Sequence, residues 1–446
     1  MKTKLVFSLA IFLTAFLLNS PISVRKENLA LAAGPDLLDN NIENGEIAAL
    51  SATFREQAQL PEKFFSARKA GAQALGGLYP LPELERTRVN FNKNSRVHLN
   101  ELPKFESNFN GRVAGLNDRD EFVFYTIDKK LQAYTKSLVK NASAPHVAIV
   151  AMDPSSGRIL AIAEKSNQIK ELSLHAGFPA ASLFKIITTA AALDAKALEP
   201  SSMIRFRGGT YTLNRSNYLA DRKRDVRALS LTEALGMSCN PAFARVALQH
   251  LSPQVLRRYS EAFGFNSAIE FEVPMDRSLA EIPDNDYELS RTAAGFGNVR
   301  ISPVHAAAFM SGIANDGLMP KPYIVNHILS RSGTVQYQAR PQAAKRVLAR
   351  DTANTLMQML ESTTTVGTSR NEFYVNKKRV LPYSVAGKTG TLSGNNPKGL
   401  NQWFIAAAPI DNPKIAVSVI SVSPAKSNAK ASRLGRQVIQ KYLADL

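Results

Sequence analysis

The stretch VAIVAMDPSSGRILAIA, residues 147–163, indicates the fold of this chain most directly. Two apolar runs, 147–152 and 159–163, flank a cluster of turn-forming residues, Asp153-Pro154-Ser155-Ser156-Gly157. Short apolar runs separated by such a cluster are typical of paired β-strands. We therefore predict a β-hairpin over 147–163.

Segments on either side of this hairpin extend the pattern. Residues 122–127 are typical of a strand, and 129–140 of a helix with Leu131, Tyr134 and Leu138 on one face. Later strands are predicted at 385–389, 403–408 and 415–422, and a C-terminal helix at 429–443. Between the early and late strands the strong segments are helical: 183–197, 231–251, 254–263, 304–316 and 353–361.

The order of these segments predicts the fold class. The hairpin and the late strands have to meet in one sheet, and the terminal helices would pack on it. We expect an α/β (α+β) fold, in which a mainly antiparallel sheet is packed by helices and carries a helical insertion. A cleft between sheet and insertion is the natural place for a functional site.

Composition excludes several classes of protein. Of the 446 residues, 45% are hydrophobic, which excludes a wholly disordered chain. The single cysteine, Cys239, cannot form an internal disulfide or a cysteine-based zinc or iron–sulfur site. The formal net charge of +18 predicts attraction to an anionic partner.

The N-terminus predicts export. After a short basic start, residues 5–18 form an apolar run interrupted only by Ser8 and Thr14, which is typical of a signal peptide or an uncleaved membrane anchor. We divide the chain into this segment (1–33), a polar lead-in or accessory region (34–120) and one large domain (121–446). In an exported protein, the positive charge favours anionic envelope polymers or membrane lipids over nucleic acid.

The sequence lacks the motifs of two common classes of hydrolase. The six histidines form no His-Glu-x-x-His pattern, and there is no Gly-x-Ser-x-Gly motif for a Ser-His-Asp esterase. A serine nucleophile can instead use a lysine as its base. In Ser182-Leu183-Phe184-Lys185 the i, i+3 spacing places both side chains on one helix face. Lys185 can accept the serine proton only if its pKa falls from about 10.4 to about 7–8, which burial and a second cation nearby would favour.

The four-residue motif is weak evidence alone, since Ser-x-x-Lys occurs six times in this chain and is most often a surface pair. The order of three motifs along the chain, and the secondary structure predicted for each, strengthen the evidence for a serine nucleophile. Ser182 opens a predicted helix, Ser238-Cys239-Asn240 lies between helices, and Lys388-Thr389-Gly390 lies on a predicted strand. Those three elements, in this order, are expected of penicillin-binding proteins and serine β-lactamases.

From about residue 122 to its end, the chain resembles the transpeptidase domain of a penicillin-binding protein. Further matching stretches lie around the three motifs: 178–181, 231–248, 295–297, 302–303, 313–317, 367–368 and 403–404. Ala181 and Leu183 depart from the pattern, because many members have Gly and Thr there. We expect both to be small packing changes. The resemblance implies the β-lactamase/transpeptidase-like fold and a serine D,D-transpeptidase that cross-links peptidoglycan stem peptides.

The resemblance also implies the catalytic residues. Ser182 would attack the carbonyl of a D-alanyl-D-alanine bond and form an acyl-enzyme, and Lys185 would take its proton. Ser238 would relay a proton to the leaving amine. Lys388 would supply positive charge that keeps Lys185 neutral.

The implied substrate-binding residues line the same site. Asn240 would hold Lys185 and the substrate backbone, and the hydroxyls of Thr389 and Thr391 would bind the terminal carboxylate. Backbone N–H groups of Ser182 and Thr391 would form the oxyanion hole. Gly390, which has no side chain, would let an extended substrate approach the strand closely.

No cofactor or metal is implied, and the expected partners are stem peptides, β-lactam antibiotics and a separate glycan polymerase. Two alternatives stay open. The acyl group could pass to water, as in a D,D-carboxypeptidase or a β-lactamase, or the domain could be a non-catalytic β-lactam sensor or scaffold. We expect Cys239 to be a packing residue and Glu233 a solvated residue of a helix surface.

Overall fold

The structure, a computed structural model, describes residues 89–91, 97–105, 108–109, 112–117, 119–339, 344–424 and 430–446. The predicted signal peptide or anchor (1–33) and the first part of the lead-in lie outside these residues. Residues Leu81–Leu446 form one compact unit. No helix within the described ranges is both long and apolar enough to cross a membrane.

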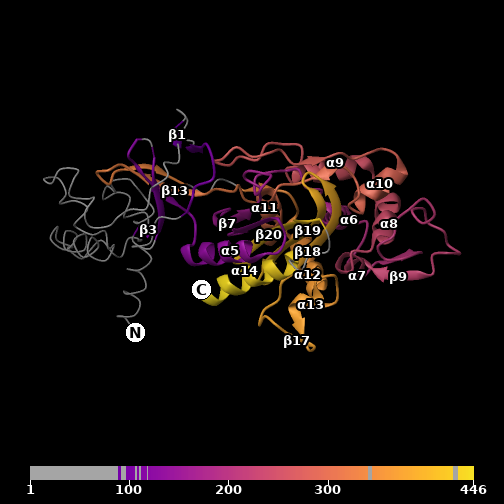
Figure 1. Ribbon diagram of the computed structural model, residues 1–446. Coiled ribbons are helices and arrows are strands. Elements are labelled where there is room, and N and C mark those ends of the chain that lie inside the picture. Colours follow the sequence, from indigo (N-terminus) through magenta and orange to yellow (C-terminus); the bar gives the residue numbers. More distant parts are fainter. Residues whose placement is uncertain are drawn as a thin grey trace, which may run out of the picture. The chain divides into compact units, whose positions relative to one another are not determined.

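A five-stranded antiparallel sheet forms the centre of this unit (Figure 1). In spatial order, its strands are β18 (Ala386–Asn395), β19 (Lys398–Ala408), β20 (Ile415–Ser423), β6 (His146–Met152) and β7 (Ile159–Lys165). The predicted hairpin is confirmed as β6 and β7. The predicted late strands are confirmed as well, and they join the hairpin where β20 pairs with β6.

Both faces of this sheet are buried. In β6, Val147, Ile149 and Ala151 belong to one apolar cluster, whereas Ala148 and Val150 belong to another on the opposite face. A strand that is covered on both sides needs apolar residues at every position. This requirement explains the unbroken run that marked the hairpin in the sequence.

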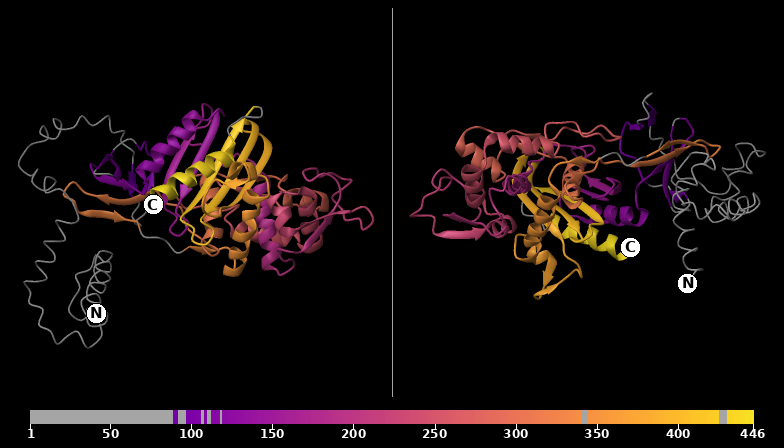
Figure 2. Two further views of the ribbon diagram at one scale, coloured as in Figure 1. Left: turned by 90° about the horizontal axis from the view of Figure 1, so that it is seen from below. Right: turned by 180° about the vertical axis from the view of Figure 1, so that it is seen from behind.

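Two helices from opposite ends of the domain cover one face of the sheet. They are α5 (Lys129–Asn141) and α14 (Ala431–Asp445), which pack against each other (Figure 2). Both helices were predicted. The buried face of α5 includes Leu131, Thr135 and Val139, while Tyr134 and Leu138 are half-buried beside it.

The other face of the sheet carries the predicted helical insertion. Helix α11 (Pro303–Ala314) packs directly on β20, β6 and β19. The remaining helices of the insertion are the 3₁₀ turn η3 (Ala181–Leu183), α6 (Phe184–Asp194), α7 (Leu231–Gly236), α8 (Asn240–His250), α9 (Pro253–Ala262), α10 (Asp286–Ala293), α12 (Arg350–Thr365) and α13 (Arg370–Phe373). The predicted segment 231–251 is therefore two helices, with Ser238 in the break between them. Helix α10 was not predicted.

The insertion also contains short strands that the sequence did not predict. Each pairs with one partner only: β8 (Met203–Phe206) with β9 (Arg227–Ser230), β10 (Leu279–Ala280) with β11 (Val299–Arg300), β12 (Leu318–Met319) with β15 (Lys345–Arg346), and β16 (Tyr374–Val375) with β17 (Lys378–Arg379). Strands β1 (Val89–Phe91) and β2 (Val97–Leu99) form a similar pair upstream.

A second antiparallel sheet includes the strand predicted at 122–127. Its order is β14 (Val335–Gln338), β13 (Val325–Leu329), β5 (Phe122–Tyr125), β4 (Arg112–Leu116) and β3 (Asn108–Phe109). The predicted domain boundary after Asp120 lies in the turn between β4 and β5, which pair with each other. The last strands of the predicted lead-in thus share a sheet with the large domain.

Candidate active site

Ser182 lies in the short 3₁₀ turn that leads into α6, as predicted for a residue at a helix start. The preceding residue, Ala181, has a φ of 51°, in the left-handed region that favours glycine. Where the resemblance leads us to expect glycine, this alanine therefore holds a strained backbone conformation, which is more than the packing change expected. A strained residue beside a nucleophile is typical of functional sites.

Lys185 lies one turn further along α6, and its side chain is fully buried. Its Nζ is 2.9 Å from Ser182 Oγ and 2.7 Å from Asn240 Oδ1, and it also donates to the backbone oxygen of Ala294. The amide and carbonyl oxygens can only accept hydrogen bonds. A neutral Lys185 would use its two N–H groups for these oxygens, and its lone pair would then face the Ser182 hydroxyl.

The surroundings of Lys185 favour that neutral form. Burial lowers the pKa of Lys185 well below its ordinary value, and the charge of Lys388 lowers it further. Burial likewise lowers the pKa of Lys388, to about 7. The positive end of the α6 dipole acts in the same direction, because the lysine lies in the first turn of the helix. The second lysine that was predicted near Lys185 is therefore close enough to lower its pKa.

Asn240 begins α8 and connects two parts of the site. Its Oδ1 accepts from Lys185, and its Nδ2 donates to the backbone oxygen of Tyr211 at 2.7 Å. Its backbone N–H donates to the oxygen of Thr210 at 2.8 Å. The second motif is thus fixed to the loop between β8 and β9.

Ser238 lies in the break between α7 and α8, with a φ of 56°. This left-handed residue ends α7 and turns the chain into α8. The Ser238 hydroxyl lines the cavity described below and makes no hydrogen bond within the described part of the chain. It is therefore available to a ligand.

The third motif lies on β18, which is the outer strand of the central sheet. Lys388 is fully buried and donates to the backbone oxygen of Thr389 at 3.0 Å. Thr389 and Thr391, two residues apart on the same side of the strand, line the cavity. The alternation of β18 thus separates the buried lysine from the two hydroxyls that a substrate can reach.

Gly390 has a structural reason other than the one predicted. A Cβ atom there would lie 3.2 Å from the backbone oxygen of Ala180 and 3.4 Å from Ala181 Cβ. The missing side chain therefore lets β18 approach the segment that carries Ser182. No contact of the structure bears on the predicted approach of a substrate at this residue.

The predicted residues surround one cavity of about 510 Å³. Ser182, Ser238, Asn240, Thr389 and Thr391 all line it, whereas Lys185 and Lys388 are buried behind its wall. The structure thus brings seven of the eight predicted residues together at this cavity, five in its lining and two lysines buried close by.

Four residues of this site were not assigned a role from the sequence. Ala294 accepts a hydrogen bond from Lys185 through its backbone, so its side chain gives no indication of this role. Thr368 Oγ1 lies 2.5 Å from Thr389 Oγ1, and Tyr211 lines the opposite wall. Gly295 has a φ of 94°, and a Cβ there would lie 2.3 Å from Ala181 O and 2.8 Å from Ser182 N. Gly295 and Thr368 lie in the stretches 295–297 and 367–368 that the resemblance already covered, whereas Tyr211 and Ala294 lie outside the matching stretches.

Two residues with possible chemistry have structural roles instead. Cys239 is fully buried, and burial raises the pKa of its thiol, which makes it a poor nucleophile. The carboxylate of Glu233 accepts from the backbone and hydroxyl of Ser230 in a capping box at the start of α7, which lowers its pKa. Among the described residues, no group of three or more His, Cys, Asp or Glu side chains could hold a metal ion.

Comparisons with known proteins agree with this geometry. The family model described as "Penicillin binding protein transpeptidase domain" matches residues 147–440. The peptidoglycan D,D-transpeptidase PbpA of Mycobacterium tuberculosis is 29% identical over 66% of this chain and 67% of its own length. Stage V sporulation protein D of Bacillus subtilis is 27% identical over 67% of this chain and 49% of its own length.

Solved structures show the same fold. The imipenem acyl-enzyme complex of penicillin-binding protein A from M. tuberculosis matches with a TM-score of 0.59 and 25% identity, covering 74% of this chain and 80% of that one. The D,D-transpeptidase domain of a peptidoglycan glycosyltransferase from Eggerthella lenta matches with a TM-score of 0.61 and 21% identity, covering 73% and 84%. The predicted antiparallel, helix-packed fold is confirmed.

Proposed function

The chain belongs to the penicillin-binding protein transpeptidase family, and from this premise we propose that it is a serine D,D-transpeptidase that cross-links peptidoglycan stem peptides and binds β-lactams. The observation that carries the proposal is the position of Lys185. It is buried, its pKa is lowered, and its Nζ lies 2.9 Å from Ser182 Oγ. A serine hydroxyl needs such a base in order to act as a nucleophile at neutral pH.

In the first half of the reaction, Ser182 Oγ attacks the carbonyl carbon of the D-alanyl-D-alanine bond while its proton passes to Lys185. The C–N bond then breaks, the leaving amine takes a proton through the Ser238 hydroxyl, and free D-alanine departs. In the second half, the amine of another stem peptide attacks the acyl-enzyme ester. Ser182 regains its proton, and the new peptide bond is the cross-link.

The polar groups of the cavity stabilise charge during these steps. We assign the terminal carboxylate of the donor peptide to the hydroxyls of Thr389 and Thr391, and the oxyanion to the backbone N–H groups of Ser182 and Thr391. One oxyanion-hole donor is worth about 3–4 kcal/mol in a comparable serine enzyme. Gly295 supports this assignment, because a side chain there would crowd Ser182 N.

Among the described residues that line the cavity, no free carboxylate is available to activate water for hydrolysis. Hydrolysis of the ester needs a base that activates a water molecule. Glu372 is the one carboxylate among the residues that line the cavity, and its oxygens are paired with Lys430 at 3.1 Å and Arg433 at 2.9 Å. These pairs lower the pKa of Glu372 and leave it a weak base.

The protein acts in the cell envelope, as the peptidoglycan activity in the name of its relative PbpA indicates. Residues 1–33 would direct export, and as an uncleaved anchor they would hold the protein at the membrane. Residues 34–120 would form an accessory region whose last strands join a sheet of the transpeptidase domain. A separate polymerase would supply the glycan strands.

Covalent labelling tests the proposal. Purified protein is incubated with penicillin, and its intact mass and proteolytic peptides are measured. We expect one adduct on the peptide that contains Ser182, and none in Ser182→Ala. An unlabelled wild-type protein, or an adduct that persists in Ser182→Ala, would overturn the proposed nucleophile.

The lifetime of the adduct separates the two acyl-transfer activities. A transpeptidase without an efficient hydrolytic base should keep its penicilloyl adduct for hours. An adduct that disappears within seconds would favour a β-lactamase. A stable adduct with no turnover of a donor peptide in the presence of any amine acceptor would favour a β-lactam sensor.

A further inference from the structure

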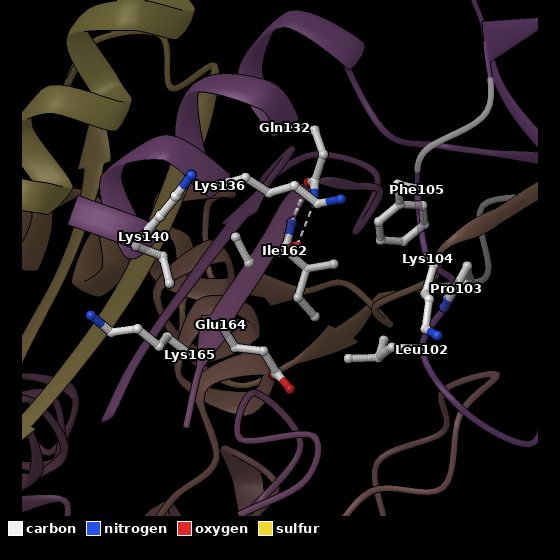
Figure 3. Close-up of a pocket in the computed structure, with 12 residues that line it drawn as sticks. Leu102, Pro103, Lys104, Phe105, Gln132, Lys136, Lys140, Ile162, Glu164 and Lys165 are labelled. Carbon is white, nitrogen blue, oxygen red and sulfur yellow. Dashed lines mark hydrogen bonds between the residues drawn. The ribbon is translucent and has the colours of Figure 1, made fainter. Parts of the chain in front are cut away.

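A second cavity, of about 410 Å³, lies at the opposite edge of the central sheet from the catalytic strand β18. Its walls are the segment 102–105, helix α5 and strand β7 (Figure 3). None of the residues assigned to catalysis lines it. It is therefore a separate feature that the transpeptidase reaction does not explain.

Specific contacts hold the walls of this cavity in place. The backbone N–H of Leu102 donates to the Glu171 carboxylate at 2.8 Å. The ring of Phe105 packs edge-on against that of Tyr125, with 5.4 Å between the ring centroids. On the other side, the Gln132 side chain bonds both backbone groups of Ile162. The cavity is thus built from three separate segments that are each fixed to the domain.

The rim of the cavity is cationic and its lining is largely apolar. Lys136 and Lys140 from α5 and Lys165 from β7 lie on one side, and Lys104 lies on the other (Figure 3). Lys136 and Lys140 are exposed and make no ion pair with another described residue. The one acidic residue of the lining, Glu164, directs its carboxylate to the backbone N–H of Ser173 at 2.8 Å.

On the outer edge of β7, backbone groups of Leu160 and Ile162 already form hydrogen bonds, whereas those of Glu164 form none with the described residues. Asp128 N donates to Leu160 O at 2.9 Å, and Gln132 pairs with Ile162 in the manner of a neighbouring strand. Since outward-facing residues alternate along an antiparallel strand, the backbone N–H and C=O of Glu164 point the same way as those of Ile162. They have no partner in the described residues, so they can pair with an added strand.

We propose that this cavity binds an extended, acidic peptide segment of a partner protein. The peptide would pair with the Glu164 backbone as a short added strand. An apolar side chain would enter the cavity, and Asp or Glu side chains would meet Lys136, Lys140 and Lys165. The inference concerns a surface on the far edge of the sheet, so it does not depend on the proposed transpeptidase activity.

Fluorescence anisotropy tests this docking site. The probe is a fluorescein-labelled hexapeptide in which Glu alternates with Leu and Val, titrated with the full chain. We expect saturable binding that weakens as salt rises to 0.15 M, where charges are screened beyond about 8 Å. The double variant Lys136→Glu with Lys140→Glu should bind at least about tenfold more weakly, because it places like charges opposite the peptide.

The same helix offers a matched control. Lys129 and Lys130 are exposed residues of α5 that do not line the cavity, so reversing both should change the affinity by less than about twofold. Labelling of Ser182 by penicillin should be unchanged in both double variants, which shows that they fold. Equal binding of a peptide with Lys in place of Glu, or equal loss in both variants, would overturn the proposal. So would tight binding of anionic lipid vesicles, lost on reversal of Lys136 and Lys140, with no binding of the peptide.

Discussion

At the scale of single residues, the site depends on two buried lysines that form no ion pair with any residue the structure describes. Lys185 and Lys388 are both fully buried, and burial lowers the pKa of each. Taking an ammonium group out of water costs free energy unless it is paired or loses its proton. Burial of these lysines therefore lowers the free energy of unfolding at neutral pH, and it keeps Lys185 as a neutral base beside Ser182.

Replacing Lys388 should therefore stabilise the fold and impair the reaction. With a pKa of about 7 when folded, Lys388 costs on the order of 4 kcal/mol at pH 7, at about 1.36 kcal/mol per pKa unit. After allowing for its lost hydrogen bond to Thr389, we expect Lys388→Met to gain about 1–3 kcal/mol in free energy of unfolding. Urea unfolding at pH 7 checks this gain, and penicillin acylation should slow strongly. A less stable variant with unchanged acylation would contradict this account of Lys388.

Gly295 is expected to be a positioning residue for the nucleophile. In Gly295→Ala, the added Cβ would meet Ala181 O at 2.3 Å and displace the turn that carries Ser182. A displacement of about 1 Å can cost 100-fold in rate, so we expect acylation to slow by that order.

Gly115→Ala is the matched control for this prediction, because the nearest atom to its new Cβ would be 3.6 Å away. Stopped-flow measurement of penicillin acylation should show a normal rate for Gly115→Ala. A normal rate for Gly295→Ala as well would contradict the positioning role.

The role of a residue in this site can be predicted from the sequence only when its side chain performs that role. Ser182, Lys185 and Lys388 were predicted because each role needs that side chain. Ala294 acts through its backbone oxygen, and no side-chain pattern can indicate it. The expectation for Ala181 was incomplete, because a positive φ is a property of the folded turn and is not visible in an alanine.

At the scale of secondary structure, the break between α7 and α8 positions the second motif. Helix α7 is short, six residues, and its N-terminus is closed by the capping box between Ser230 and Glu233. Its C-terminal end is fixed by Thr368, whose backbone N–H donates to Gly236 O at 3.1 Å. Ser238 is thus held between two fixed helices.

This arrangement gives Glu233 a structural role that can be tested. Glu233→Ala removes half of the capping box and should lower the free energy of unfolding by about 0.3–1.5 kcal/mol, whereas Glu233→Gln should retain the cap. Neither change should alter the lifetime of the penicilloyl adduct, measured by mass spectrometry. A markedly longer lifetime in both variants would instead identify Glu233 as a hydrolytic base.

The elements that the sequence predicted are the ones with long, regular apolar patterns. The hairpin β6–β7 and strands β19 and β20 are buried on both faces, so their apolar runs are continuous. Strands β8 and β9 each include an exposed arginine, and most of the added pairs are only two residues long. Such strands form because the surrounding fold places their backbones together, and local sequence does not encode that placement.

At the scale of the whole domain, Glu272 joins the upstream strands to the second sheet. Its carboxylate accepts from the backbone N–H groups of Ile324 and Val325, and its backbone oxygen accepts from Leu99 at 2.7 Å. Burial raises the pKa of this carboxyl to about 7. The native state therefore holds a proton here that an unfolded chain releases near pH 4.5.

The free energy of unfolding should therefore depend on pH through the protonation of Glu272. Because the folded pKa is the higher one, the stabilising contribution is complete below about pH 4.5 and is lost as the pH rises through about 7. Glu272→Gln removes this dependence. Between pH 5 and pH 8, urea unfolding should show the variant gaining up to about 3 kcal/mol relative to the wild type. A constant difference between the two proteins across this range would contradict the raised pKa.

The most direct test of the catalytic account is the pH dependence of acylation. The second-order rate constant for penicillin labelling of Ser182 is measured in the full chain from pH 5 to pH 10. If Lys185 is neutral because it is buried beside Lys388, the rate should already be at its maximum near pH 7 and should stay level up to pH 10. A rate that instead rises about tenfold per pH unit up to pH 10, as an ordinary lysine with a pKa of about 10.4 requires, would contradict the account.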